Sequence, residues 1–272
     1  MRRLKTFMMI GVILLSGLLN LTGCSKRYSE KELKEIVQVA LENKYQEEFI
    51  CLDVWSSGGE GFQSVCYPKS NRDLLFETIC LKDGNLVRDG YAASIVSKEF
   101  SEKFDNEVGS SLGTHFTYCN NAGNMYDDVT AEKISNGEFT LDYFFSTRLE
   151  THNNNELELY YTICFDTSGA GQLSFGDEYD EIINALENIK ENANTEYGIE
   201  LSYRMNLYFV PKDIYDDCID YFEKNAEIRS VFQDMIEGYP VRKFNRLIKF
   251  DVGLNIFPIT KDEYINQREE VN

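Results

Sequence analysis

Basic side chains are far fewer than acidic ones in this chain. Its 272 residues include 27 Lys and Arg against 46 Asp and Glu, which gives a formal net charge of −19 at pH 7. Proteins that bind nucleic acids neutralise phosphates with clustered Lys and Arg, and an excess of acids opposes that contact. We therefore expect no nucleic-acid partner.

Proline, histidine and tryptophan are rare as well, with four Pro, two His and one Trp. So few prolines exclude a Pro-rich low-complexity chain. Aromatic residues make up 13% of the chain and hydrophobic residues 43%, which is enough apolar material for a packed core. This composition excludes disorder along the whole chain.

The chain also lacks any Cys-x-x-Cys pair, so nothing supports a zinc ribbon or a thioredoxin-like redox motif. Seven cysteines are nevertheless spread along it. Those that follow Cys24 could form disulfides in several connectivities or remain buried thiols, and the sequence leaves both open. They are Cys51, Cys66, Cys80, Cys119, Cys164 and Cys218.

Only one long uncharged apolar run is present, and it lies at the start of the chain. Arg2, Arg3 and Lys5 precede it, and the run from Phe7 to Leu19 carries no charge. It is shorter than the roughly 20 residues of a spanning helix and is typical of the hydrophobic part of a signal peptide.

Small residues after this run lead directly into a cysteine. The sequence Leu21-Thr22-Gly23-Cys24 resembles the lipobox of bacterial lipoproteins, which signal peptidase II cleaves. The resemblance implies removal of residues 1–23 and a diacylglyceryl group on Cys24, with fatty acyl chains such as palmitate. Two acyl chains hold a protein stably on a bilayer. We therefore expect an extracytoplasmic protein anchored by lipid to the outer face of the cell membrane.

Cleavage would make the chain still more acidic. Removing residues 1–23 takes away three basic and no acidic residues, so the formal net charge moves from −19 to −22. Anionic headgroups repel such a body, whereas a basic protein partner would attract it. Frequent Asn, Lys, Glu, Tyr and Ile also indicate a Gram-positive type of envelope.

The mature chain is predicted to contain a tether at residues 24–28 and two folded units. In the first unit, residues 29–112, Ser29 and Glu32 form a capping box at the start of a helix. Hydrophobic periodicity then predicts a three-strand meander and a second helix. The expected elements are a helix at about 30–45, strands at 49–55, 62–67 and 74–81, and a helix at about 92–107.

The second unit, residues 113–272, is expected to begin with a strand and a loop at 120–137. A hairpin with His152 in its turn should follow. The further expected elements are strands at 115–119, 139–145, 157–165, 199–209 and 248–256, a helix at about 178–193, and helical segments from 211 to 235. Apolar and polar residues alternate cleanly in most strands, which indicates sheets with one buried and one polar face. We therefore predict an α+β fold of antiparallel sheets with helices packed on one face.

The segment Gly109-Ser110-Ser111-Leu112-Gly113 matches the G-x-S-x-G motif of hydrolases. That motif needs a strand before its serine and a helix after it. Here the expected order is the reverse, which favours a helix end followed by a link. A surface hydrolase remains the alternative function.

Two further patterns could bind metals. His115 and Cys119 lie four residues apart on an expected strand and could offer two zinc ligands, but no second pair accompanies them. A segment from Asp166 resembles a calcium loop but lacks the final Glu, so we interpret it as a connection with Asp177 as helix cap. The sequence therefore predicts no catalytic residue, metal ligand or cofactor.

An acidic stripe is expected on the helix after Pro211. Its aspartates are spaced by three and four residues, which places them along one face. They are Asp213, Asp216, Asp217 and Asp220. This face is either solvated or docks a basic protein partner. Because no catalytic set has its required context, the predicted function is a non-catalytic binding or accessory module.

Overall fold

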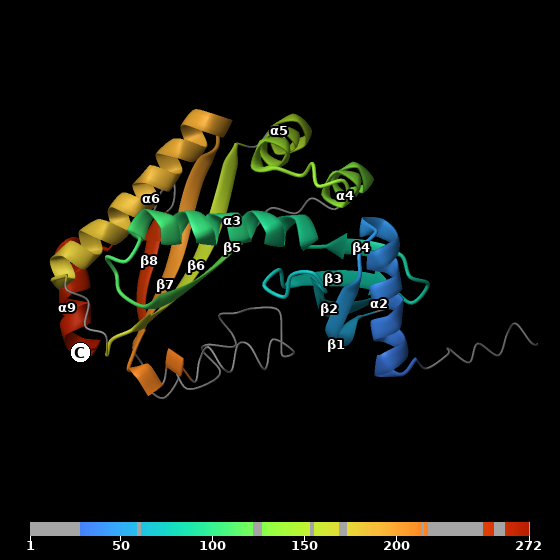
Figure 1. The fold of residues 1–272 in the computed structure, drawn as a ribbon, viewed down its shortest axis with the longest axis horizontal. Helices are drawn as coiled ribbons and strands as arrows, with labels where there is room; N and C mark the ends of the chain where they lie inside the picture. Colours follow the sequence, from blue (N-terminus) through green and yellow to red (C-terminus); the bar gives the residue numbers. More distant parts are fainter. Residues whose placement is uncertain are drawn as a thin grey trace, which may run out of the picture.

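The fold is seen in a computed structural model, which describes residues 28–58, 61–121, 127–152, 155–168, 173–213, 215–216, 247–252 and 259–271. These residues form an α+β fold, as predicted, with two four-stranded sheets ordered β1-β2-β3-β4 and β5-β6-β7-β8 (Figure 1). The helices are α2 (Glu30–Tyr45), α3 (Tyr91–Val108), α4 (Asp128–Ser135), α5 (Leu141–His152), α6 (Phe175–Tyr197) and α9 (Lys261–Val271). The strands are β1 (Phe49–Gly58), β2 (Gly61–Pro68), β3 (Phe76–Leu81), β4 (Leu86–Asp89), β5 (His115–Asn121), β6 (Glu156–Asp166), β7 (Glu200–Val210) and β8 (Leu247–Val252).

Helix α2 begins at the predicted capping box. The Ser29 hydroxyl accepts from the Glu32 backbone N–H at 3.2 Å, and the Glu32 carboxylate accepts from the Ser29 N–H at 2.9 Å. Val37, Leu41 and Tyr45 then recur at one-turn spacing and are buried in the core of the first sheet. Local capping and tertiary packing therefore specify the same helix.

The first sheet has four strands, so the predicted three-strand meander is wrong by one strand. All neighbouring strands pair antiparallel. The additional strand, β4, has only four residues, of which Val87 and Arg88 are exposed. So short and polar a run shows too little alternation to be recognised from the sequence.

The second sheet contains a parallel pair, which corrects the prediction of antiparallel sheets. Strands β6 and β7 pair parallel from Glu156↔Glu200 to Asp166↔Val210, and helix α6 connects them. The pairs β5–β6 and β7–β8 are antiparallel. One face of β6 and β7 packs with α3 and α6 in a common core, which explains why these parallel strands still alternate in polarity.

Helix α3 contributes to the cores of both sheets. Its first residue, Tyr91, packs in the first core against Tyr45 and Phe76. The remaining buried apolar stripe of the helix lies in the second core: Ala92, Val96, Phe100, Phe104 and Val108. In Figure 1, α3 runs from the first sheet across to the second. The helix that ends the predicted first unit therefore packs mainly with the second sheet.

A buried carboxylate connects α2, β4 and α3 where they meet. Asp89 is 0% exposed and accepts from Tyr45 Oη at 2.5 Å and from Lys44 Nζ at 2.8 Å. The Tyr91 backbone N–H donates to the same carboxylate at 3.3 Å. A buried charge costs free energy unless it is paired and hydrogen-bonded, and these three donors supply that compensation.

Two helices replace an expected loop and an expected strand. Helix α4 lies within the expected loop 120–137, and Asp127 caps it by accepting from the Thr130 N–H at 2.9 Å. Helix α5 replaces the expected strand 139–145, because Leu141, Phe144 and Phe145 are buried in the second core at helical spacing. His152 accordingly ends a helix instead of lying in a hairpin turn.

The C-terminal helix α9 has a mostly polar sequence, and no hydrophobic periodicity predicts it. Its Arg268 Nε donates to Glu178 Oε1 on α6 at 2.7 Å, and the guanidinium carbon lies 3.7 Å from the centre of the Phe209 ring. Helix α6 itself is capped by Ser174, whose hydroxyl accepts from the Asp177 N–H at 3.2 Å. The prediction of Asp177 as the cap is therefore wrong.

Candidate functional site

The sequence-predicted site residues are only partly within the described residues. Cys24 lies outside them, as do Asp217 and Asp220. Asp213 and Asp216 are helical and exposed, directly after β7. The lipidation and the complete acidic stripe therefore remain predictions.

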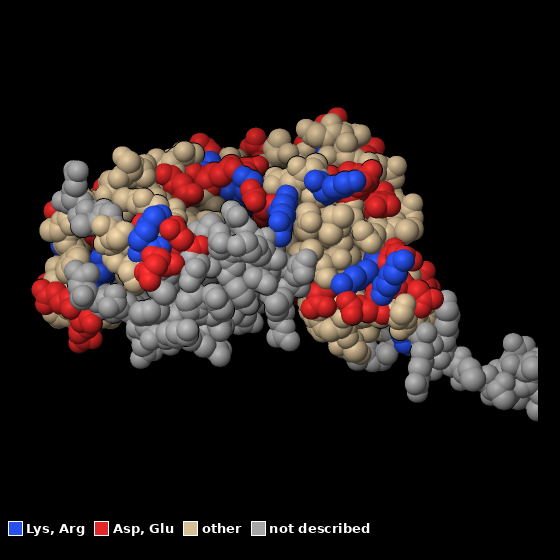
Figure 2. Space-filling view, turned by 60° about the horizontal axis from the view of Figure 1, so that its bottom comes forward, with Lys and Arg blue, Asp and Glu red and all other residues tan. Residues whose placement is uncertain are grey.

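A lysine neutralises part of the expected acidic stripe. Lys212 Nζ lies 2.8 Å from Asp216 Oδ1 and 3.7 Å from Asp166 Oδ2. Figure 2 likewise shows Lys and Arg side chains next to acidic ones at several places on the face in view. Exposed pairs of this kind contribute little stability, but they lower the local density of negative charge.

Ser111 lies in the link between α3 and β5, so the predicted reverse order of the G-x-S-x-G segment is confirmed. Its hydroxyl lies 2.5 Å from the Val108 carbonyl oxygen and 2.8 Å from Glu181 Oε1 on α6. One serine proton is thus shared between two acceptors that belong to the helix end and to α6. This geometry joins α3 to α6.

His115 begins β5, and both of its ring nitrogens have partners. Nδ1 lies 2.9 Å from the Gly113 carbonyl oxygen, and Nε2 lies 3.2 Å from Asp105 Oδ1 on α3. Burial opposes charge on the ring, but the hydrogen bonds to Asp105 and Gly113 outweigh it and raise the pKa of His115. Two acceptors favour the doubly protonated ring, which donates from both nitrogens. In that form His115 cannot act as a general base.

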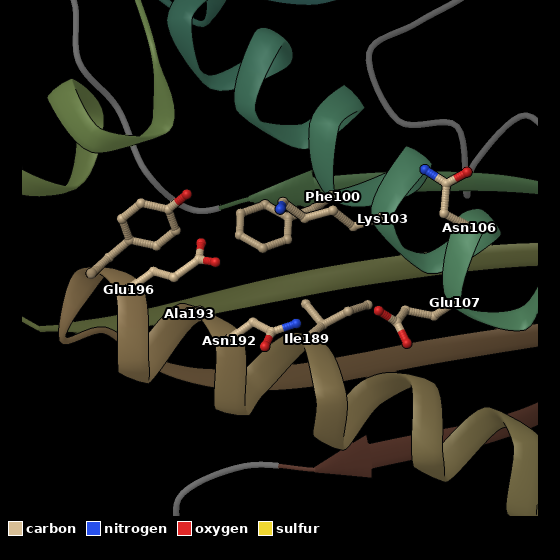
Figure 3. Close-up of a pocket in the computed structure, with 9 residues that line it drawn as sticks. Phe100, Lys103, Asn106, Glu107, Ile189, Asn192, Ala193 and Glu196 are labelled. Carbon is tan, nitrogen blue, oxygen red and sulfur yellow. The ribbon is translucent and has the colours of Figure 1, made fainter.

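A shallow hollow of about 110 Å³ lies between α3 and α6 (Figure 3). Phe100 and Ala193 are buried in its apolar part. The polar lining comes from positions that flank the buried stripes of the two helices: Lys103, Asn106 and Glu107 on α3, and Asn192, Glu196 and Tyr197 on α6. Helical periodicity could have identified these positions as flanking residues, but not as facing one another.

The lining of the hollow offers one ammonium group, two carboxylates and two amides. Burial and the Glu196 carboxylate raise the pKa of the Tyr197 hydroxyl to about 12, so Tyr197 is a hydrogen-bond donor at neutral pH. Sites for small organic ligands typically enclose about 300–1,000 Å³. A hollow of this size instead fits a few waters or one side chain of a partner.

The described cysteines are buried free thiols, namely Cys51, Cys66, Cys80, Cys119 and Cys164, while Cys218 lies outside the described residues. Within the described ranges, no three His, Cys, Asp or Glu side chains gather in a way that could hold a metal ion. The part of the chain that the structure describes contains no helix that is both long and apolar enough to cross a membrane.

Comparisons with known proteins reveal a shared fold. No protein-family model matches the sequence, and no curated protein matches it. The crystal structure of a DUF5037 family protein from Ruminococcus gnavus ATCC 29149 is similar, with a TM-score of 0.57 and 14% sequence identity over 87% of this chain and 99% of that one. A DUF1672 family protein from Staphylococcus aureus subsp. aureus Mu50 matches with a TM-score of 0.29 and 8% identity, over 65% of this chain and 78% of that one. At 14% identity, the first similarity shows the fold alone.

The raised pKa of His115 predicts a pH-dependent contribution to stability. The contribution should be complete below the unfolded-state pKa of about 6.5 and should disappear as the pH rises through the higher folded-state pKa. His115→Gln should therefore lower the free energy of unfolding more at pH 5.5–6 than at pH 8.5–9, as measured by urea denaturation. Equal destabilisation at both ends of this range would contradict the raised pKa of His115.

Proposed function

We propose that the chain is a lipid-anchored extracytoplasmic protein whose α+β body acts as a non-catalytic binding or accessory module. The observation that carries this proposal is the basic start, the apolar run and Leu21-Thr22-Gly23-Cys24 in the order found in bacterial lipoproteins. The two acyl chains expected on Cys24 would supply stable membrane affinity without a spanning helix.

The distance from Cys24 to the folded body supports an anchoring role. Residues 25–28 alone separate Cys24 from Ser29, the cap of α2. A fully extended chain covers at most about 3.6 Å per residue, so the start of α2 would lie within roughly 20 Å of the lipid attachment. An anchored body would therefore be held close to the headgroups.

The hydrogen bonds of Ser111 and His115, the polar residues in and next to the G-x-S-x-G segment, favour a binding role over catalysis. Ser111 bonds to Val108 and Glu181, and His115 bonds to Gly113 and Asp105. In the observed arrangement these bonds join α3 to α6 and to β5. They give the residues structural roles, and the ring nitrogens of His115 bond to Gly113 and Asp105 and not to the serine.

A basic protein surface is the partner that the charge of the body favours. Anionic headgroups repel a body of formal charge −22, so the acidic surface is suited to a protein and not to the lipid. The screening length at physiological ionic strength is about 8 Å, which restricts the attraction to close contacts.

The association rate with such a partner should fall as salt is added, and an association rate that is independent of salt would contradict this choice.

Lipid labelling tests the proposed anchor directly. In bacteria that express the full chain and are fed a labelled fatty acid, the wild-type protein should incorporate the label and fractionate with membranes. Cys24→Ala removes the thiol that would accept the diacylglyceryl group, so incorporation of label should be lost.

Ser25→Ala is the matched control, because it changes the neighbouring residue and keeps the cysteine. It should retain the label. Unchanged lipid incorporation in Cys24→Ala would show that the anchor assignment is wrong.

A further inference from the structure

Two cysteines face each other directly across the first hairpin. Cys51 on β1 and Cys66 on β2 are register partners in an antiparallel pair. Both are buried in the same core, with 7% and 0% of their surface exposed. Directly opposed residues have Cα atoms about 4.5–5.5 Å apart, which lies within the range of about 4.4–6.8 Å found in disulfides.

The remaining described cysteines have no such partner. Cys80 pairs with Phe62, which lies four residues from Cys66 along β2. Cys119 pairs with Tyr161 on the face covered by α3 and α6. Cys164 alternates with Ile163 and Phe165 and thus lies on the opposite face of that sheet from Cys119. Among the described residues, strand register therefore selects one pair from the connectivities that the sequence left open.

The environment of the pair gives the two thiols different reactivity. A hydrogen-bond interaction with the Cys66 side chain lowers the pKa of Cys51 against the effect of burial, and Ser64 and the Lys34 ammonium on α2 act in the same direction. The Cys66 thiol itself donates to Ser64 Oγ at 3.8 Å. Burial raises the pKa of Cys66. Cys51 also lies on the edge strand of the sheet and keeps some exposed surface. Cys51 is therefore the thiol that would react first, because the thiolate is the nucleophile in disulfide exchange.

We propose that Cys51 and Cys66 are a modification site at which the exported protein acquires a cross-strand disulfide. The inference rests on the proposed extracytoplasmic location in one respect, because that environment supplies the oxidant. The oxidant is the disulfide form of a small thiol or of a thiol oxidoreductase.

The exchange proceeds in two balanced steps. Cys51 loses its proton to solvent, and its thiolate attacks one sulfur of the external disulfide, which forms a mixed disulfide and releases one external thiolate that takes up a proton. Cys66 then loses its proton to solvent and attacks the Cys51 sulfur, which forms the Cys51–Cys66 bond and releases the second external thiolate. The two protein thiols are oxidised, and the external disulfide is reduced to two thiols.

The disulfide would fasten the part of the fold that lies nearest the anchor. Strand β1 is at the edge of its sheet, and α2, which follows the tether, shares a core with it. A covalent bond to β2 would keep this edge strand in register. It would also stabilise the folded state, because the cross-link restricts the unfolded chain.

Oxidation of the full chain, purified in mild detergent under reducing conditions, tests the site. After incubation with reduced glutathione and glutathione disulfide, the protein should lose about 2 Da, which corresponds to two hydrogens. A peptide map should show Cys51 linked to Cys66. The melting temperature should rise by roughly 5–10 °C and should fall again on reduction.

Two variants give the result further resolution. Cys66→Ser should leave glutathione bound to Cys51, because the second thiol is missing, and Cys119→Ser, a buried cysteine of the other core, should behave as the wild type. Absence of the linked peptide in the wild type, or a link from Cys51 or Cys66 to any other cysteine, would overturn the proposal even where a variant does not fold. The oxidation test uses the purified chain and does not depend on the lipid anchor. If lipid labelling fails but the Cys51–Cys66 peptide is found, the anchor proposal is wrong and the disulfide proposal stands.

Discussion

The rest of the structure depends on the packing of α3 in two cores at once. Tyr91, at its start, is enclosed by Tyr45 and Phe76 of the first core, and Phe100 and Phe104 further along are buried against the second sheet. Asp89, the last residue of β4 and two residues before the helix, accepts from Lys44 and Tyr45 of α2. Because a helix is a rigid connection over this length, α3 couples the two sheets. The end of the same helix also positions the hydrogen bonds from Ser111 to Glu181 and from His115 to Asp105.

Helices and strands could be predicted from the sequence where one hydrophobic periodicity dominated. Ser29, Glu32 and the stripe ending at Tyr45 specified α2, and the alternation from residue 199 to 209 specified β7. The prediction failed at 139–145, where alternating residues also satisfy a helical pattern and tertiary burial of Phe144 and Phe145 decided the outcome. Alternation could not reveal that β6 and β7 are parallel, because one-sided burial produces the same pattern in either direction.

Features of the candidate site could be predicted from the sequence only where they depend on neighbouring elements. The expected order around Ser111 could be predicted because it depends only on neighbouring elements, whereas its bond to Glu181 joins residues far apart in the sequence. The pairing of Cys51 with Cys66 depends on strand register, which shifts between Cys51 and Asp53 and which composition does not determine. The four-residue spacing of Lys212 and Asp216 on a predicted helix could have indicated their ion pair, but only the structure places Lys212 Nζ 3.7 Å from Asp166 Oδ2.

Unfolding of a variant in α3 tests the coupling of the two cores most directly. The single tryptophan, Trp55, lies on β1 and reports on the first sheet, whereas Phe104 is 0% exposed and packs on Tyr161 in the second core. Phe104→Ala should cost about 3–5 kcal/mol. Coupling of the two cores through α3 predicts that the urea midpoints from Trp55 fluorescence and from far-UV circular dichroism fall together. A Trp55 midpoint that stays at its wild-type value while the circular dichroism midpoint falls would contradict it.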